Sequence, residues 1–269
     1  LSGNRRARAK AITLVESSRP EDREASQVLL NQLLPHTGKS LRIGITGVPG
    51  VGKSTFIEAF GQHLISEGHK VAVLAVDPSS PMAGGSILGD KTRMELLSRD
   101  PNAFIRPSPA GRALGGVALK TRESMLLCEA AGFDVVLVET VGVGQSEHQV
   151  SSMVDFFLML LLPGGGDELQ GIKKGILELA DAIMINKADG ESASLARKTK
   201  LHYQSAMSLL ASNDFWKPEV HTCSALEHDG IADCWSMMKR YQQEATERGA
   251  LSQTRAEQNL QWMTQHFRS

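Results

Sequence analysis

The sequence has few cysteines, few aromatic residues and almost no excess of charge. Its 269 residues include three cysteines, Cys128, Cys223 and Cys234, which are scattered and form no C-x-x-C pair. This odd, dispersed set predicts buried thiols in a reducing compartment and argues against a disulfide framework or a zinc site. The net charge of −1 provides no overall basic field that would bind nucleic acid or an anionic membrane.

Long apolar runs are also lacking. The longest run is 156–162 (FFLMLLL), whereas a helix that spans a bilayer needs roughly 20 apolar residues. The run fits a buried strand of a parallel sheet instead. No apolar signal segment follows Leu1, although a removed targeting peptide would leave no trace. We expect a protein of the bacterial cytosol, or of the mitochondrial matrix if the source is eukaryotic.

The motif G-x-x-x-x-G-K-[ST] is present directly after the apolar run 41–46. Its glycines let the loop wrap closely, so that backbone N–H groups point at the α- and β-phosphates. Lys53 reaches the β- and γ-phosphate oxygens, and the Ser54 hydroxyl coordinates Mg²⁺. The alternative, a plain glycine turn, is disfavoured by the strand and helix patterns on either side. The predicted nucleoside triphosphate site comprises Gly47, Val48, Pro49, Gly50, Val51, Gly52, Lys53, Ser54 and Thr55.

From residue 41 onward, short apolar segments alternate with helical patterns, which is typical of a parallel α/β sheet. Strands are predicted at 42–47, 71–77, 135–140, 156–162, 182–187 and 219–223, with a short one at 103–106. Helices are predicted at 53–67, 117–131, 168–180, 193–211 and 229–243. Gly68 stands where a C-terminal helix cap belongs.

Helical patterns also flank this region. Residues 5–34 read as two helices joined by a turn at Pro20, and residues 33–40 look like a joint to the main domain. The polar tail from Arg240 is either a packed arm or a partner-binding helix. We therefore predict an N-terminal helical extension at 1–37, a nucleotide-binding domain at 38–238 and a C-terminal helical arm at 239–269.

A second motif, N-K-x-D, ends an apolar strand. The Asp189 carboxylate would accept two N–H bonds from the guanine edge, the Asn186 amide would contact the base and brace the loop, and the Lys187 stem would stack on the ring. Adenine lacks these donors and would leave a buried carboxylate unpaired. Alone the tetrapeptide also fits a turn, but after a phosphate loop it favours GTP over ATP. A third base contact is predicted through backbone N–H groups of Ser224, Ala225 and Leu226.

Three acidic residues stand where γ-phosphate chemistry is expected. Asp77 and Glu139 end strands, at the usual edge for ligands in such sheets, and Asp90 follows a glycine-rich segment. With Ser54 they suit a Mg²⁺ ion held mostly through waters. The backbone N–H of Gly142 could contact the γ-phosphate and so respond to its presence. For Asp90, a helix N-cap is the alternative.

Longer strings make the chain recognisable. The segments 75–81 (AVDPSSP), 84–94 (GGSILGDKTRM), 139–147 (ETVGVGQSE) and 164–175 (GGGDELQGIKKG) resemble the MeaB/ArgK/MMAA family, and the resemblance runs from about residue 8 to 265. These GTPases accompany adenosylcobalamin-dependent methylmalonyl-CoA mutase. The resemblance implies a P-loop NTPase fold of the SIMIBI-type G domain, with a mostly parallel central sheet flanked by helices, an N-terminal helical hairpin and a C-terminal arm. It also implies GTP or GDP and Mg²⁺ as cofactors, a homodimer, and a chaperone that gates cofactor loading and protects the mutase.

The resemblance also implies roles for single residues. It assigns phosphate and magnesium to Lys53 and Ser54, the metal and water network to Asp77, Asp90 and Glu139, and guanine to Asn186, Lys187 and Asp189. Residues 163–175 are implied to couple nucleotide state to the mutase and to complete the catalytic site, with charge and hydrogen bonding from Asp167, Gln170 and Lys173. A plain glycine loop capped by Asp167 is the alternative.

Two features depart from the family pattern. Arg112 stands where small polar residues are expected, which makes the role of residues 106–116 less certain. Relatives continue in helices beyond Ser269, so the dimerising arm is expected to be incomplete here.

The expected activity is slow, switch-like hydrolysis of GTP, in which positioning and charge stabilisation do the catalysis. No glutamine directly follows the segment 139–142 to orient water, so Asp77 or Glu139 is expected to do so, with Lys173 as the stabilising group ordered by a partner. Three other functions stay open: a P-loop kinase linked to arginine and ornithine transport, a metal-delivery GTPase, and a scaffold without hydrolysis. The eight dispersed histidines disfavour metal delivery, and the catalytic set disfavours the scaffold.

Overall fold

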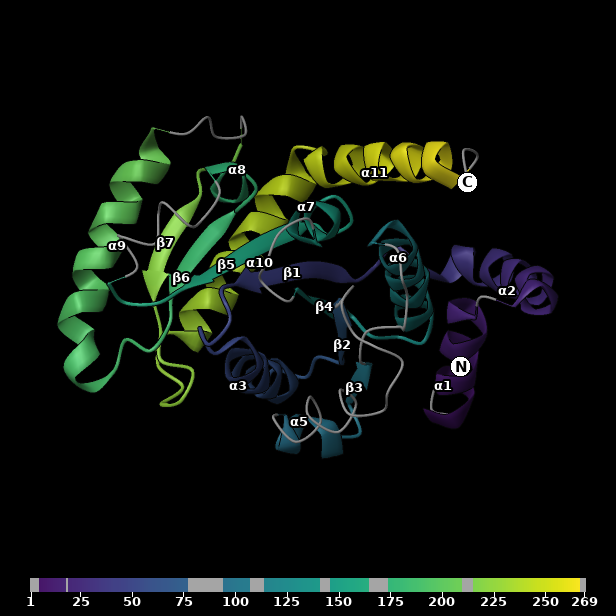
Figure 1. Cartoon of the computed structure of the whole chain (residues 1–269), viewed down its shortest axis with the longest axis horizontal. Coiled ribbons are helices and arrows are strands. Elements are labelled where there is room, and N and C mark those ends of the chain that lie inside the picture. The colour runs from purple at the N-terminus through teal and green to yellow at the C-terminus, as the bar shows by residue number, and fades with distance from the viewer. Residues whose placement is uncertain are drawn as a thin grey trace.

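The structure is a computed structural model, and it describes residues 5–17, 19–76, 94–106, 114–140, 146–164, 174–209 and 215–266. A seven-stranded sheet forms its centre, with the strand order β3-β2-β4-β1-β5-β6-β7 (Figure 1). Every pairing between these described strands is parallel. The strands are β1 Leu41–Gly47, β2 Val71–Val76, β3 Ala103–Arg106, β4 Val135–Thr140, β5 Phe156–Leu161, β6 Ala182–Ile185 and β7 Glu219–Thr222.

Helices cover both faces of this sheet. Their bounds are α3 Lys53–Ser66, α5 Glu95–Arg99, α6 Leu114–Ala130, α7 Ser146–Ser151, α8 Lys174–Leu177, α9 Ala193–Ser208 and α10 Ile231–Glu247. On β5, Phe156 and Leu158 pack with α3, α5 and α10, whereas Phe157 packs with α6 and α7 and Met159 with α8 and α9. Successive side chains of a strand point to opposite faces, so burial of both faces favours apolar residues at every position, as β5 shows.

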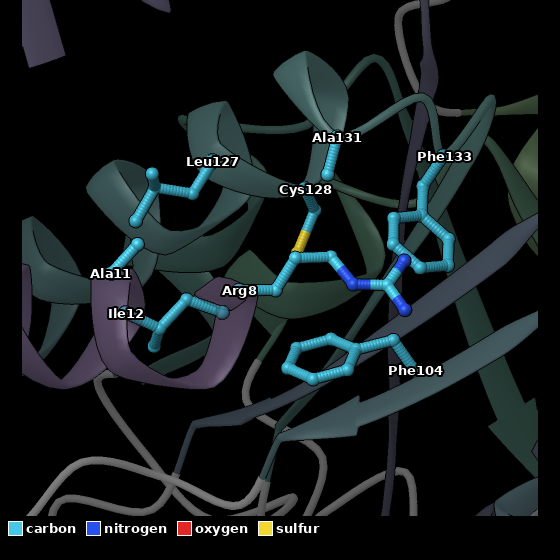
Figure 2. A pocket seen from close by; sticks show the side chains of 8 residues that line it. All are labelled: Arg8, Ala11, Ile12, Phe104, Leu127, Cys128, Ala131 and Phe133. Atoms are coloured by element: carbon cyan, nitrogen blue, oxygen red, sulfur yellow. The ribbon is translucent and has the colours of Figure 1, made fainter. Parts of the chain in front are cut away.

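The N-terminal extension is a hairpin of α1 (Arg5–Glu16) and α2 (Pro20–Leu33), which packs on α6. Figure 2 shows how α1 is held: the Arg8 guanidinium lies 4.9 Å from the ring centroid of Phe133 and 5.8 Å from that of Phe104. Beside them the apolar side chains of Ala11 and Ile12 meet α6. The stem of an arginine can cover apolar surface while its guanidinium stacks on rings, so Arg8 helps to hold α1 against β3 and the turn before β4.

The C-terminal helix α11 (Ala250–His266) is tied to the opposite end of the sheet from the carboxyl ends of its strands. Arg255 donates to both carboxylate oxygens of Asp155, at 2.8 and 2.6 Å, and to the carbonyls of Gly38 and Ser40. The Asp155 side chain is fully buried, and that of Arg255 is 16% exposed. A charge removed from water in this way needs its partner, so this ion pair anchors α11.

The predicted α/β fold with a parallel sheet and helical extensions is confirmed, and each predicted strand is present to within two residues at either end. β6 ends at Ile185 rather than 187 because the chain leaves the sheet at Asn186. Gly68 caps α3 as expected, with φ of +92° and its N–H donated to the carbonyl of Ile65. The short helices α5 and α7 were not predicted. α8 ends at Leu177, and residues 168–173 of the helix predicted there lie outside the described residues.

The division at residues 37/38 and 238/239 stays a prediction. α10 runs without a break from Ile231 to Glu247, so the second boundary falls inside one helix. None of the helices within the described ranges has the length and apolar character that a membrane crossing requires.

We predict that Arg255→Ala lowers the free energy of unfolding by roughly 3 kcal/mol, because it leaves the buried carboxylate of Asp155 without its partner. Urea denaturation measures the change. Arg240→Ala is the matched control, since the pair of Arg240 with Glu219 is 54% and 31% exposed and its loss should cost no more than about 1 kcal/mol. Equal losses for the two variants would show that Arg255 does not anchor α11.

Candidate functional site

The glycine-rich loop joins the end of β1 to the start of α3, in the middle of the sheet between β4 and β5. Gly52 has φ of +94° and precedes the helix, and Gly50 has φ of +83°. A Cβ atom on Gly47 would lie 2.6 Å from the carbonyl oxygen of Leu160. Only glycine therefore fits where β1 turns over β5, and the turn aims the first N–H groups of α3 out of the sheet edge, as anion binding requires.

Lys53 is the first residue of α3, and its side chain lies back over the loop. Its Nζ atom donates to the carbonyl of Gly47 at 2.7 Å. Burial lowers the pKa of the Lys53 ammonium, while the nearby carboxylates of Glu139 and Glu147 oppose that shift. Ser54 beside it is half-buried and Thr55 is exposed. The cation is thus held at the mouth of the loop, where phosphate oxygens would meet it.

The N-K-x-D segment contacts this loop directly. Asn186 is 1% exposed, and its Nδ2 atom donates to the carbonyl of Val51 at 2.9 Å. Lys187 has φ of +58°, and its Nζ atom donates to the carbonyl of Gly50 at 2.9 Å. A non-glycine residue in this region of φ is uncommon and needs support from its surroundings. The two motifs predicted separately from the sequence therefore lie in direct contact and form one candidate site.

The segment after β7 completes this arrangement. The Ala225 N–H donates to the Oδ1 atom of Asn186 at 3.1 Å, and the Ser224 hydroxyl donates to a carboxylate oxygen of Asp189 at 2.5 Å. The Ala188 N–H donates to the carbonyl of Cys223 at 3.0 Å. Ser224 thus orients the half-buried carboxylate of Asp189. Leu226, two residues after Ser224, is 76% exposed.

The acidic part of the predicted site is described only in part. Glu139 lies at the end of β4, half-buried, opposite Ile45 of β1 and Ala75 of β2. The neighbouring Thr140 donates its hydroxyl to that of Thr46 at 2.8 Å, which fixes the end of β4 against β1. The predicted site residues that lie outside the described residues are Asp77, Asp90, Gly142 and Lys173.

Glu147 was missed by the sequence reasoning, although it ends the string at 139–147. Glu147 lies in α7 and is 1% exposed, and its carboxylate counteracts the lowering of the Lys53 pKa by burial. In the described ranges, no three His, Cys, Asp or Glu side chains converge as ligands for a metal ion. Described oxygen donors near the loop include the Ser54 hydroxyl and the carboxylates of Glu139 and Glu147.

Comparison with known sequences identifies close relatives. A sequence profile of the family described as methylmalonyl-CoA mutase-associated GTPase MeaB matches residues 8–269. The chain is 59% identical to a protein named putative GTPase from Caulobacter vibrioides, over 98% of this chain and 81% of the relative. It is 54% identical to GTPase ArgK of Escherichia coli, over 97% and 79%. A Mus musculus protein named methylmalonic aciduria type A homolog, mitochondrial, is 50% identical over 98% and 66%.

Comparison with solved structures agrees. A crystal structure described as LAO/AO transport system kinase superposes with a TM-score of 0.85 at 45% identity, covering 99% of this chain and 80% of that one. HypB from Helicobacter pylori in complex with nickel superposes with a TM-score of 0.54 at 15% identity, covering 81% and 93%. The second similarity is one of fold alone.

We predict that Gly52→Ala lowers the affinity for GDP by about tenfold or more, measured by titration calorimetry. A Cβ atom there would lie 2.8 Å from the Nδ2 atom of Asn186 and displace it from Val51. Gly68→Ala is the matched control: its φ is +92°, and nothing lies within 4 Å of the new atom. Both variants strain the backbone, but only the first disturbs the site. If Gly52→Ala binds GDP as tightly as Gly68→Ala does, the close contact has no role in binding.

Proposed function

The chain belongs to the MeaB family of methylmalonyl-CoA mutase-associated GTPases, and we propose that it binds and hydrolyses GTP where the P-loop meets the N-K-x-D segment. One observation carries this proposal: the buried amide of Asn186 is bonded both to the phosphate loop at Val51 and to the base-binding segment at Ala225. A nucleotide whose phosphates lie on the loop would then place its base against Asp189 and Ser224.

The phosphate end of the site is proposed to work by charge and position. Lys53 would exchange the carbonyl of Gly47 for β- and γ-phosphate oxygens, and the N–H groups at the start of α3 would bind the remaining oxygens. Mg²⁺, when bound, would neutralise charge on the β- and γ-phosphates. Ser54 and Glu139 fit such an ion, because hydroxyl and carboxylate oxygens are the donors it prefers; Asp77 and Asp90 are proposed to join them.

Hydrolysis requires a positioned water molecule and little covalent chemistry from the protein. Glu139, at the end of β4, is proposed to orient that water, with Asp77 as the alternative. Gly142 is proposed to sense the γ-phosphate through its N–H group. Lys173 is proposed to supply a stabilising charge when the loop 163–175 is ordered by a partner. Without the partner, Lys173 would not be held in place, which would account for a slow basal rate.

Association with adenosylcobalamin-dependent methylmalonyl-CoA mutase is proposed as the biological role. The family description and the name of the Mus musculus relative support it. In this role the nucleotide state would gate cofactor loading and protect the mutase. A homodimer, and a place in the bacterial cytosol or the mitochondrial matrix, are proposed with it; neither nucleic acid nor a membrane is a proposed partner.

A kinase acting in basic amino-acid transport is the second candidate, favoured by the description of the similar crystal structure and by the relative named ArgK. GTP carrying a labelled γ-phosphate separates the two functions. Label released as free phosphate supports hydrolysis, whereas label on protein, arginine or ornithine supports the kinase. Metal delivery gains no support beyond a shared fold.

We predict that Asp189→Asn changes the preferred base. The carboxylate accepts from both N1–H and the N2 amine of guanine, whereas an amide would donate to the 2-oxo group of xanthine. The affinity for GDP should fall about a hundredfold and that for xanthosine diphosphate should rise, as measured by calorimetry. Asp229→Asn, which changes an exposed carboxylate in the neighbouring segment between β7 and α10, is the control and should bind GDP normally. Unchanged GDP binding in Asp189→Asn would refute the assignment of Asp189.

We predict that the mutase raises the rate of GTP hydrolysis at least about tenfold, and that Lys173→Ala keeps the basal rate but loses most of this increase. Phosphate release with and without the mutase measures both. Lys239→Ala, on the exposed side of α10, is the control. Equal turnover with and without the mutase would reject the coupling, and full stimulation of Lys173→Ala would reject the role of the lysine alone.

A further inference from the structure

A cavity of about 360 Å³ lies at the end of β1 remote from the P-loop. Residues of α2, α6 and α11 line it, together with Arg42 at the start of β1. In Figure 1 these three helices surround the end of the sheet at which α11 crosses towards the C-terminus. The volume is within the range of sites that bind small molecules, and none of the residues proposed for nucleotide binding lines it.

Two of the three arginines in this cavity are neutralised by buried carboxylates. Arg42 donates to both carboxylate oxygens of Glu129, at 2.6 and 3.1 Å. Arg255 forms its double hydrogen bond with Asp155. Such fork-to-fork pairs satisfy charge and geometry together, so these four residues hold the wall in place.

Arg122 of α6 is different, because the contacts described for its guanidinium are with neutral groups. Its residue is 6% exposed, its Nη2 atom donates to the amide oxygen of Asn259 at 2.5 Å, and its guanidinium lies 5.6 Å from the ring centroid of Trp262. Burial, reinforced by Arg42 and opposed by Glu129, lowers the pKa of Arg122 to about 10. The folded chain therefore disfavours the charged form of Arg122, and a bound anion would stabilise that form.

The rest of the lining suits an acid with an apolar body. Leu30 of α2, Leu126 of α6 and the Trp262 ring provide apolar surface, and Gln27 of α2 provides an amide. Burial, opposed by Lys120, raises the pKa of the Glu123 carboxyl to about 7, so much of it is neutral near pH 7 and can donate a hydrogen bond. A carboxylate entering here would meet the guanidinium of Arg122, whose described hydrogen bond is to a neutral amide, and a Glu123 carboxyl that is partly neutral.

We propose that this cavity binds a small organic acid, with its carboxylate paired to the guanidinium of Arg122 and its apolar body between Leu30, Leu126 and Trp262. The planar fork of an arginine matches a carboxylate in two parallel hydrogen bonds. The ligand would touch α2, α6 and α11 at once, and so would fasten both helical extensions to the nucleotide-binding domain.

Hexanoate and hexanamide are the probes, because they share a body and differ in charge. Each is titrated into the full chain at pH 7 with tryptophan fluorescence and calorimetry as readouts. Hexanoate should bind at least about tenfold more tightly than hexanamide and should change the emission of Trp262, which Trp262→Phe identifies. Absence of hexanoate binding, or equal affinity for the two compounds, would overturn the proposal.

Two variants test the role of Arg122. Arg122→Gln should weaken hexanoate binding about tenfold or more, whereas Arg248→Gln, an exposed arginine at the end of α10, should not. Asn259→Asp places a carboxylate against Arg122 from within the chain, so it should also abolish hexanoate binding while the chain stays folded, as normal GDP binding would show. If Arg122→Gln fails to fold, Asn259→Asp decides. Wild-type hexanoate affinity in either folded variant would reject the assigned contact.

Discussion

The hydrogen bonds of one buried amide hold together the two halves of the proposed nucleotide site. Asn186 donates to the carbonyl of Val51 and accepts from the N–H of Ala225, and its side chain is closed off from water. A buried amide that lost these partners would cost about 1–3 kcal/mol for each unsatisfied group. The phosphate loop, the base-reading segment and the turn after β7 are therefore constrained to keep one arrangement, although they are distant in the chain.

The parallel sheet gives this unit a firm base. β1 ends in the phosphate loop between β4 and β5, and β6 ends at Asn186, so both motifs emerge from the same edge. At the other end of β1, buried ion pairs of Arg42 and Arg255 fasten α6 and α11 to the sheet. Chemistry that depends on position is thus placed on strand ends rather than on long unsupported loops.

Most of the fold follows from local pattern, and most of the site's geometry does not. Continuous apolar runs predicted the strands closely, because a strand buried on both faces is mostly apolar. The helices α5 and α7 were missed because segments of five and six residues carry too little periodicity. The motifs identified Asn186 and Lys53 by residue type, but the bond from Asn186 to Val51, the positive φ of Lys187 and the burial of Glu147 depend on contacts between distant segments.

Calorimetry of Asn186→Ala with GDP and with inorganic pyrophosphate tests the central claim most directly. Pyrophosphate has no base, so it reports on the phosphate loop alone. If the Asn186 amide braces that loop through Val51, the variant should lose affinity for pyrophosphate as well as for GDP, each by about tenfold or more. Unchanged pyrophosphate affinity together with weakened GDP binding would contradict the account, because the amide would then serve the base alone.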